Sequence, residues 1–211
     1  SISGPTDAII RYTTDGTEPK ETSPTYSAPF TPVATSRIRA KAYKTGLLPS
    51  NEISAEVKIH TQLPALSLVR APLPGIKVQV TSVEEGNYTS ESIQRGLIEK
   101  SDEAVNFELD PLCKDKCGMI WKGFINIPQS GGYHFYTESD DGSLLTVDSV
   151  VNVHNDGDDG TAEKSGVVNL QKGWHSIRIV YFNSGGGSGF NVWYAPLGED
   201  KMEITEEMMG H

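Results

Sequence analysis

The stretch WKGFINIPQSGGYHFYTESDDGSLLTVDS, residues 121–149, decides the fold of the larger part of this chain. It contains three runs of strand-forming residues, separated by the turn signals Gly131-Gly132 and Asp140-Asp141-Gly142. Similar runs follow at 167–170, 176–182 and 190–194. Many short strands with such punctuation predict an antiparallel β-sandwich or barrel.

The first 60 residues predict strands by a different signal, the alternation of apolar and polar residues. Residues 36–42 and 53–59 alternate in this way, as half-buried strands do. Residues 8–13 form a third predicted strand, which ends at the turn dipeptide Asp15-Gly16. The whole chain is therefore predicted to be all-β, with two antiparallel β-sandwich domains, the first small and the second larger, and little helix.

A domain boundary is predicted in residues 61–75, TQLPALSLVRAPLPG, which contain three prolines. Proline fixes φ and removes a backbone donor, so this segment is typical of an extended, stiff linker. We therefore assign residues 1–60 to the first domain, 61–75 to the linker and 76–211 to the second domain. Only residues 89–104 leave a short helix open as an alternative to strand.

The charge of the chain excludes some classes of partner. The formal net charge is −10, and residues 61–211 carry 11 Lys and Arg against 22 Asp and Glu. An acidic surface repels phosphate backbones, so we expect no nucleic acid partner. No apolar run reaches the length of a membrane-spanning helix, and residues 1–5 do not resemble a secretory leader. We expect no membrane insertion, and either a mature protein or a fragment.

Cys113 and Cys117 are the two cysteines of the chain. Their spacing allows either a small disulfide loop or two free thiols. A zinc site would need more cysteine or histidine nearby, and the five histidines are scattered. A disulfide is the favoured alternative, and it would indicate an oxidising compartment.

The triplet Asp140-Asp141-Gly142 has two interpretations. Asp-Asp-Gly between two strands is an ordinary hairpin turn. Two neighbouring carboxylates also suit a calcium ion, which takes six to eight oxygen ligands. The residues alone leave both interpretations open. A second acidic cluster, residues 155–160, lacks the spacing and the helices of a helix-loop-helix calcium site and is predicted to be a solvated loop.

Catalysis by this chain is not expected. It has no glycine-flanked serine nucleophile, phosphate-binding loop or His-Glu-x-x-His motif. A carboxylate pair can always be chosen from 28 acidic residues and proves nothing. Trp121, Trp174 and Trp193 lie within or at the start of predicted strands, where tryptophan is more often core than an exposed stacking surface, and we predict that all three are core.

Residues 10–30, IRYTTDGTEPKETSPTYSAPF, and 37–50, RIRAKAYKTGLLPS, resemble the chitobiase/β-hexosaminidase C-terminal domain. The resemblance extends over essentially all of residues 1–60. It implies an immunoglobulin-like β-sandwich of the kind appended to glycoside hydrolases. Because members of this family usually have one more strand before the position of Ser1, we expect the chain to begin part-way into the domain.

Residues 76–197 resemble the lectin-like β-sandwich domain named after the anthrax protective antigen. The segments WKGFINIPQSGGYHFYTESDDGSLLTVDSVVNVHNDGDDG, residues 121–160, and VNLQKGWHSIRIVYFNSGGGSGFNVWYAPLG, residues 168–198, carry the resemblance through the order of their motifs. The family occurs in glycosidases, toxins and adhesins, and carbohydrate binding is its most frequent role.

In lectin members of this family the paired aspartates share a cis peptide bond and hold a calcium ion, which sugar hydroxyls also bind. An asparagine and backbone carbonyls from a glycine-rich loop complete the site. The resemblance implies these calcium ligands: Asp140, Asp141, Asn183, Gly185 and Gly187. The implied carbohydrate-binding residues are Asp140, Asp141, Asn183 and Ser184. The loop NSGGGSG, residues 183–189, departs from the lectins because it lacks a bulky or aromatic residue to stack on a sugar.

Together these observations and resemblances predict a non-catalytic, carbohydrate-binding accessory region of a bacterial glycoside hydrolase, with a β-N-acetylhexosaminidase as the expected parent. The expected partners are a glycan or polysaccharide and the catalytic domain of the same polypeptide, with calcium as the expected cofactor. The expected location is secreted, periplasmic or at the cell surface. The alternative is a structural spacer or protein-interaction module that packs on a catalytic domain without binding glycan.

Overall fold

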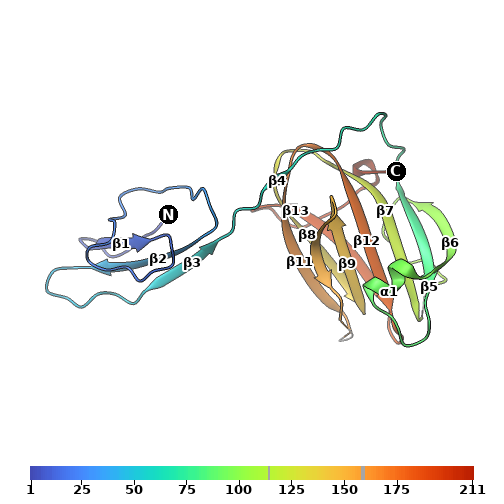
Figure 1. Ribbon diagram of the computed structural model, residues 1–211, viewed down its shortest axis with the longest axis horizontal. Helices are drawn as coiled ribbons and strands as arrows, with labels where there is room; N and C mark the ends of the chain where they lie inside the picture. Colours follow the sequence, from blue (N-terminus) through green and yellow to red (C-terminus); the bar gives the residue numbers. More distant parts are fainter. Residues whose placement is uncertain (114, 158–159) are drawn as a thin grey trace. The chain divides into compact units, whose positions relative to one another are not determined.

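The structure, a computed structural model, describes residues 1–113, 115–157 and 160–211. The chain divides into two compact units, Ser1–His60 and Thr61–His211, which Figure 1 colours along the sequence. Strands dominate both units, so the all-β prediction is confirmed. Helix α1 (Ser90–Arg95) is the only α-helix in the described part of the chain. No helix among these residues is long and apolar enough to cross a membrane.

The first unit contains one antiparallel sheet in the order β1-β2-β3. Its strands are β1 (Ile9–Thr13), β2 (Ser36–Tyr43) and β3 (Ile53–Val57). Tyr12 of β1 packs on the ring of Phe30 at a centroid distance of 5.2 Å and on that of Tyr26 at 6.1 Å. Tyr26 N also donates to Ile10 O at 2.8 Å. The loop between β1 and β2 therefore packs against β1 through aromatic side chains.

The second unit is a sandwich of two sheets (Figure 1). The larger sheet has the order β10-β9-β12-β7-β5-β6, and β15 pairs with β7. Its strands are β5 (Ile76–Ser82), β6 (Leu97–Ala104), β7 (Cys117–Ile127), β9 (Gly142–Val147), β10 (Val150–Asn155), β12 (Gly173–Asn183) and β15 (Met209–Gly210). The smaller sheet has the order β14-β13-β8-β11-β4. Its strands are β4 (Gln62–Leu63), β8 (Gly131–Asp140), β11 (Ala162–Leu170), β13 (Gly189–Pro196) and β14 (Met202–Glu203).

The core of the second unit lies between its two sheets. Alternate residues of β8 and β12 face inward, and the largest fully buried side chains include Trp121, Tyr133, Phe135 and Tyr181. Trp121 stacks on Phe190 of the opposite sheet at a centroid distance of 5.0 Å. Contacts of this kind join the two sheets through aromatic rings.

Two of the three tryptophans are not core, so that prediction is wrong for Trp174 and Trp193. Both are half-buried, whereas Trp121 is fully buried. Successive side chains of a strand face opposite sides, and Val192 and Tyr194 are the buried residues of this part of β13. Trp193 therefore lies on the outer face of the smaller sheet.

Residues 61–75 belong to the second unit, whose boundary lies at Thr61 and not within the segment. Strand β4 pairs in parallel with β11, and Leu66 N donates to Trp174 O at 2.8 Å. Leu73 and His211 exchange backbone hydrogen bonds of 3.0 and 2.9 Å. Backbone groups of this segment thus form hydrogen bonds with the sandwich, and the segment is part of the second unit.

Helix α1 covers part of the outer face of the larger sheet. Thr89 caps it, because Thr89 Oγ1 accepts from Ser92 N at 3.1 Å while Ser92 Oγ accepts from Thr89 N at 3.0 Å. Ile93 is fully buried and packs with Ile120, Val180 and Phe182. This apolar cluster fixes the helix beside the ends of β7 and β12.

A buried histidine ties β12 to the turn between β9 and β10. His175 is fully buried, with Nδ1 2.5 Å from Asp148 Oδ2 and Nε2 2.8 Å from Gln171 O. Asp148 and Ser149 both have positive φ, as in the tight turns that join antiparallel strands. We expect His175→Ala to lower the free energy of unfolding of the second unit by about 2–3 kcal/mol, because it removes a fully buried ring and both of its hydrogen-bonding contacts.

Urea unfolding followed by circular dichroism measures this effect. Lys172→Ala, a change at a neighbouring exposed position, is the matched control and is expected to be neutral. Equal stability of the His175→Ala and Lys172→Ala proteins would contradict the assignment.

Candidate functional site

Asp140 and Asp141 connect the two sheets of the sandwich. Asp140 is the last residue of β8, in the smaller sheet, and Gly142 is the first residue of β9, in the larger sheet. Strand β8 pairs with β11 and β13, whereas β9 pairs with β10 and β12. The hairpin interpretation is therefore wrong: the dipeptide crosses from one sheet to the other. The peptide bond between the two aspartates is cis, as the resemblance implied.

The glycine-rich loop, residues 184–188, is a second crossover beside the first. It leads from β12 in the larger sheet to β13 in the smaller one. The register places Gly189 opposite Asp140 and Phe182 opposite Gly142. Two segments far apart in sequence are thus aligned at one end of the sandwich by strand pairing.

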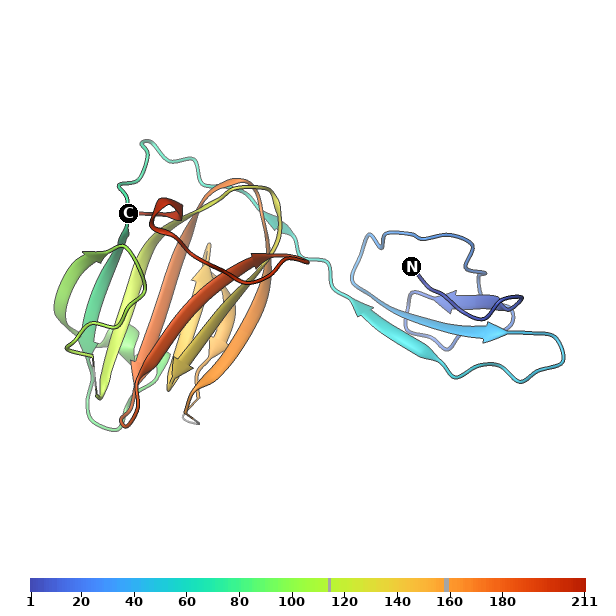
Figure 2. The ribbon, with the colours of Figure 1, turned by 180° about the vertical axis from the view of Figure 1, so that it is seen from behind.

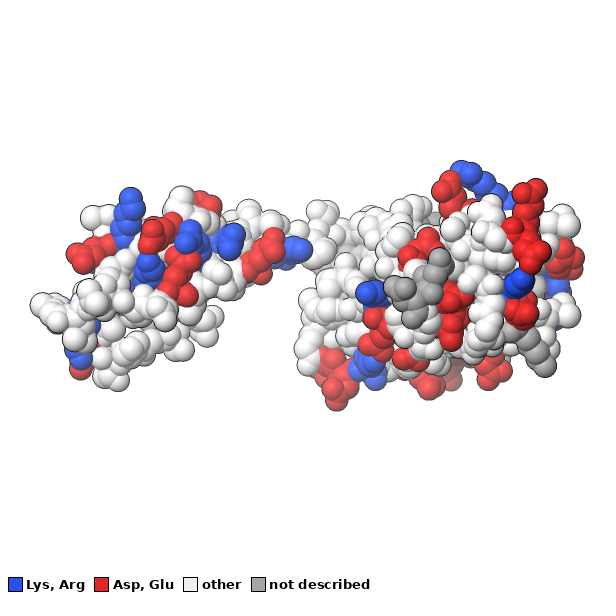
Figure 3. Space-filling model, turned by 90° about the horizontal axis from the view of Figure 1, so that it is seen from below, with Lys and Arg blue, Asp and Glu red and all other residues white. Residues whose placement is uncertain are grey.

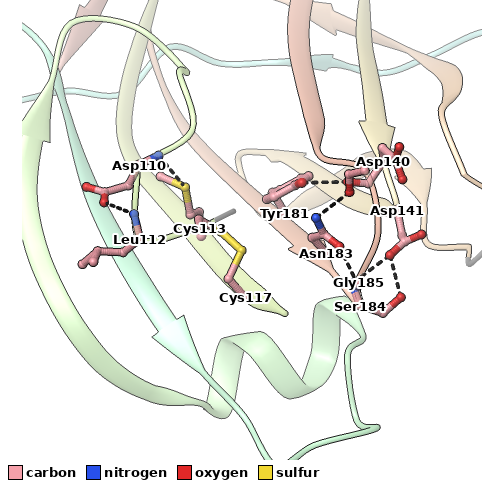
Figure 4. The surroundings of a disulfide bond; sticks show 12 residues. Asp110, Leu112, Cys113, Cys117, Asp140, Asp141, Tyr181, Asn183, Ser184 and Gly185 are labelled. Carbon is pink, nitrogen blue, oxygen red and sulfur yellow. Dashed lines mark hydrogen bonds between the residues drawn. A yellow bond between two sulfur atoms is a disulfide. The ribbon is translucent and has the colours of Figure 1, made fainter. Parts of the chain in front are cut away.

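Side-chain hydrogen bonds join the two crossovers (Figure 4). Asp141 is only 7% exposed, and its Oδ2 accepts from Ser184 N at 2.7 Å and from Ser184 Oγ at 2.5 Å. Asn183 is fully buried; its Nδ2 donates to Gly187 O at 2.7 Å and its Oδ1 accepts from Gly185 N at 2.6 Å. The buried amide thereby fixes the course of the loop.

Two glycines of the loop are required by geometry. Gly185 has a φ of +135°, a conformation that other residues rarely adopt. A Cβ atom at Gly187 would lie 2.9 Å from Asp140 Oδ2, so the carboxylate of Asp140 lies directly against the loop backbone. All the predicted site residues are therefore neighbours at this end of the unit: Asp140, Asp141, Asn183, Ser184, Gly185 and Gly187.

Tyr181 and Thr161 also contact the site, although no motif in the sequence predicted either role. Tyr181 Oη donates to the backbone O of Asp140 at 2.7 Å, and Thr161 Oγ1 donates to Asp140 Oδ2 at 3.2 Å. Burial raises the pKa of Tyr181 above its ordinary value, and the carboxylates of Asp140 and Asp141 act in the same direction.

A buried network of polar side chains lies next to the Asp140-Asp141 crossover, on the strands that lead into and out of it. Ser143 Oγ donates to Thr137 Oγ1 at 2.8 Å and lies 2.9 Å from Ser139 Oγ. Asn155 Nδ2 donates to Ser139 Oγ at 3.0 Å and to Ala162 O at 2.7 Å. These side chains link β8, β9 and β10 where an ordinary sandwich core would be apolar. Hydroxyls at the alternate positions 137 and 139 were the sequence signal for it.

The disulfide lies at the same end of the unit (Figure 4). Cys113 and Cys117 are bonded to each other, which confirms the favoured alternative. Cys117 pairs with Asn183 at the end of β12. A Cβ atom on Gly185 would lie 3.4 Å from Asp115 Oδ1, so the disulfide loop packs on the glycine-rich loop.

This end of the unit is acidic. Figure 3 views the molecule from below, and acidic side chains predominate on the face of the second unit that it shows. In the second acidic cluster, Asp156 accepts from Ser90 N at 3.2 Å and from Ser90 Oγ at 2.8 Å. The cluster lies between strands β10 and β11, not between helices, and its residues Asp158 and Asp159 are outside the described residues.

The donor atoms of the site suit a hard cation. Carboxylate oxygens of Asp140 and Asp141, an amide oxygen of Asn183 and loop carbonyls are all oxygen ligands, which calcium prefers. In the described ranges, no three His, Cys, Asp or Glu side chains are grouped as a metal site.

Two family models match the chain. The chitobiase/beta-hexosaminidase C-terminal domain matches residues 1–55, and the PA14 domain matches residues 109–207. The second match is to the PA14 domain in general and not to the protective antigen in particular. A comparison with curated protein sequences gave no match.

Several solved structures share the fold of the second unit. The PA14 domain of the MpAFP antifreeze protein has a TM-score of 0.58 and 12% identity, over 68% of this chain and 93% of that one. The PA14 sugar-binding domain from an RTX adhesin has a TM-score of 0.55 and 18% identity, over 66% and 99%. The Epithelial Adhesin 6 A domain from Candida glabrata, in complex with Galb1-3GlcNAc, has a TM-score of 0.55 and 12% identity, over 68% and 89%. At these identities the likeness shows the fold alone.

The raised pKa of Tyr181 gives a test of the site's packing. Because the folded state resists ionisation of this phenol, its contribution to stability is complete below the unfolded pKa of about 10 and is lost as pH rises beyond it. We expect Tyr181→Phe to show a smaller loss of stability between neutral and strongly alkaline pH than the parent protein. Denaturant unfolding across this pH range measures it, with Tyr43→Phe in the first unit as the control. Parallel pH profiles for the parent and Tyr181→Phe would contradict the prediction.

Proposed function

We propose that this chain is a non-catalytic, carbohydrate-binding accessory region that binds glycan at the Asp140-Asp141 crossover with the help of calcium. One observation carries the proposal. Two adjacent carboxylates and a fully buried asparagine amide, from crossovers far apart in sequence, converge at one acidic end of the sandwich. A hollow of about 210 Å³ opens beside Asp141 and gives a ligand access to it.

The residues of the site have different roles in binding. Asp140, Asp141, Asn183 and the carbonyls of Gly185 and Gly187 would hold the ion, which supplies coordination positions for neighbouring sugar hydroxyls. Ser184 keeps Asp141 in place through two hydrogen bonds to one carboxylate oxygen. The remaining carboxylate oxygens are acceptors for hydroxyl donors of a sugar.

Proteins of similar fold support carbohydrate binding as the function. Two of the similar folds are described as a sugar-binding domain and as an adhesin with a bound Galb1-3GlcNAc. The match of residues 1–55 to a chitobiase/beta-hexosaminidase C-terminal domain favours a glycoside hydrolase, of the β-N-acetylhexosaminidase kind, as the parent protein. The disulfide favours a secreted, periplasmic or cell-surface location, which is oxidising.

Such a region would act by concentration and not by chemistry. A glycan held at the Asp140-Asp141 crossover stays near a catalytic domain of the same polypeptide, so encounters with that domain become effectively intramolecular. Its contribution would therefore be largest for insoluble or dilute polysaccharide.

Removal of calcium tests the proposal. We expect isothermal titration with galactose-, mannose- and N-acetylglucosamine-bearing glycans to show binding in calcium, and chelation to abolish it. Asp141→Asn removes one charged ligand and is expected to bind neither calcium nor glycan measurably. Silence across the whole glycan panel in the presence of calcium would overturn the proposal in favour of a structural spacer.

A pair of glycine variants tests the geometry of the site. Gly187→Ala places a Cβ atom 2.9 Å from Asp140 Oδ2 and must displace the carboxylate, whereas Gly189→Ala meets no atom within 4 Å. We expect Gly187→Ala to weaken calcium binding by about tenfold with little change in melting temperature, because the displaced group is a ligand and not a core residue. Calcium titration of both variants measures this. Equal affinities would remove Asp140 from the ligand set.

A further inference from the structure

Strand β13 leaves part of one edge open, next to the crossover. On the side away from β8, β14 pairs with Trp193 and Tyr194 only. No described strand covers residues 189–192 on that side. The segment 106–108 lies across from this edge, and a groove of about 310 Å³ separates the two. Figure 2, seen from behind, shows β13 on this face of the unit.

The groove combines one aromatic surface with several hydrogen-bonding side chains. Its lining includes Trp193, a half-buried residue, beside the exposed residues Asn191 and Glu203 on one wall and Asn106 and Glu108 on the other. Phe107, beneath the second wall, is buried edge-on against Trp121 and anchors that wall to the core.

The indole is held in position from outside the groove. Lys201 Nζ lies 4.7 Å from the centroid of the Trp193 ring and 5.2 Å from that of Tyr136, and it pairs with Glu163 at 2.7 Å. Cation–π contacts of this kind fix the orientation of the indole, and Trp193 is also one of the residues that line the groove.

Both walls of the groove are connected along the chain to the crossover. On one wall, β13 begins at Gly189, which pairs with Asp140, and Trp193 follows about 13 Å further along the strand. On the other wall, the chain runs from Glu108 through the disulfide loop to Asp115, whose carboxylate lies against Gly185. A linear ligand that starts at Asp140 and Asp141 is thereby directed toward Trp193.

We propose that this groove is a second saccharide subsite, in which Trp193 stacks on a sugar ring, and that the glycan is a neutral oligosaccharide whose end occupies the crossover. This inference rests on the function proposed above and adds the length and charge of the ligand to it. Pyranose C–H faces pack on an indole, and amide and carboxylate side chains bind hydroxyls. The carboxylates of Glu108 and Glu203 disfavour an acidic glycan.

The subsite also supplies what the glycine-rich loop lacks. Residues 183–189, NSGGGSG, offer no ring for a sugar to stack on. In the strand that follows the loop, Phe190 is buried against Trp121, so Trp193 is the first ring of β13 that is only half-buried.

Isothermal titration in calcium tests the proposal, with galactose, Galb1-3GlcNAc, N-acetylglucosamine and a series of chitin oligomers as probes. For the parent chain we expect affinity to rise from the monosaccharide to the longer sugar. Trp193→Ala should remove that rise, about tenfold, and leave the affinity for the monosaccharide and for calcium unchanged. Trp193→Phe, which keeps a smaller ring, should retain part of it.

Trp174→Ala is the matched control, since Trp174 is also half-buried but lies at the start of β12, away from the groove. Circular dichroism confirms that each variant folds. Equal affinity for short and long sugars, or an unchanged length dependence in Trp193→Ala, would overturn the subsite while leaving calcium-dependent binding intact. Absence of binding by the parent chain to every probe would overturn both proposals. A gain in affinity from an extended peptide instead of a sugar would assign the open edge to a protein strand and overturn the subsite.

Discussion

The site depends on strand register at one end of the sandwich. Asp140 faces Gly189 and Gly142 faces Phe182, so two crossovers between the same pair of sheets run side by side. A shift of either pairing by one residue would exchange inward and outward side chains and would separate Asp141 from Ser184, which are 43 positions apart in sequence. The carboxylates, the amide and the loop carbonyls therefore form one site only because the two sheets are correctly paired.

Near this crossover the sandwich buries polar side chains at positions where apolar side chains are usual. The hydroxyls of Thr137, Ser139 and Ser143 are fully buried, yet each has a hydrogen-bonding partner, and Asn155 connects them to the backbone of the next strand. A satisfied network of this kind is rigid, since breaking any contact leaves a buried polar group alone. The crossover is thus supported by a rigid network, while Asp141 borders an open hollow.

The proposed sugar site uses two features, the oxygen ligands of the crossover and the ring of Trp193. They lie apart, but the glycine-rich loop and β13 connect them. The crossover provides negative charge and oxygen ligands and contains only small side chains. The ring of Trp193 lies further along β13, the strand that the glycine-rich loop enters. Because the disulfide loop borders the glycine-rich loop and leads back to the wall of the groove, the same two segments frame both features. Such an arrangement suits an extended ligand better than a single ring.

The sequence predicted most of the strands and the end of the first domain at residue 60, and it favoured the disulfide between Cys113 and Cys117, because alternation, turn residues and cysteine spacing are local features. Through the resemblance, the order of its motifs also implied the paired aspartates and the asparagine loop as a site. It did not determine that Asp140 and Asp141 cross between sheets, that residues 61–75 pack on the second unit, or that Trp193 faces outward beside a groove. It gave no sign of Tyr181 and Thr161 as contacts of Asp140. Alternation reports that one face of a strand is buried, but not which strand lies next to it. Those outcomes were decided by pairing between segments far apart in sequence, which only the folded chain brings together.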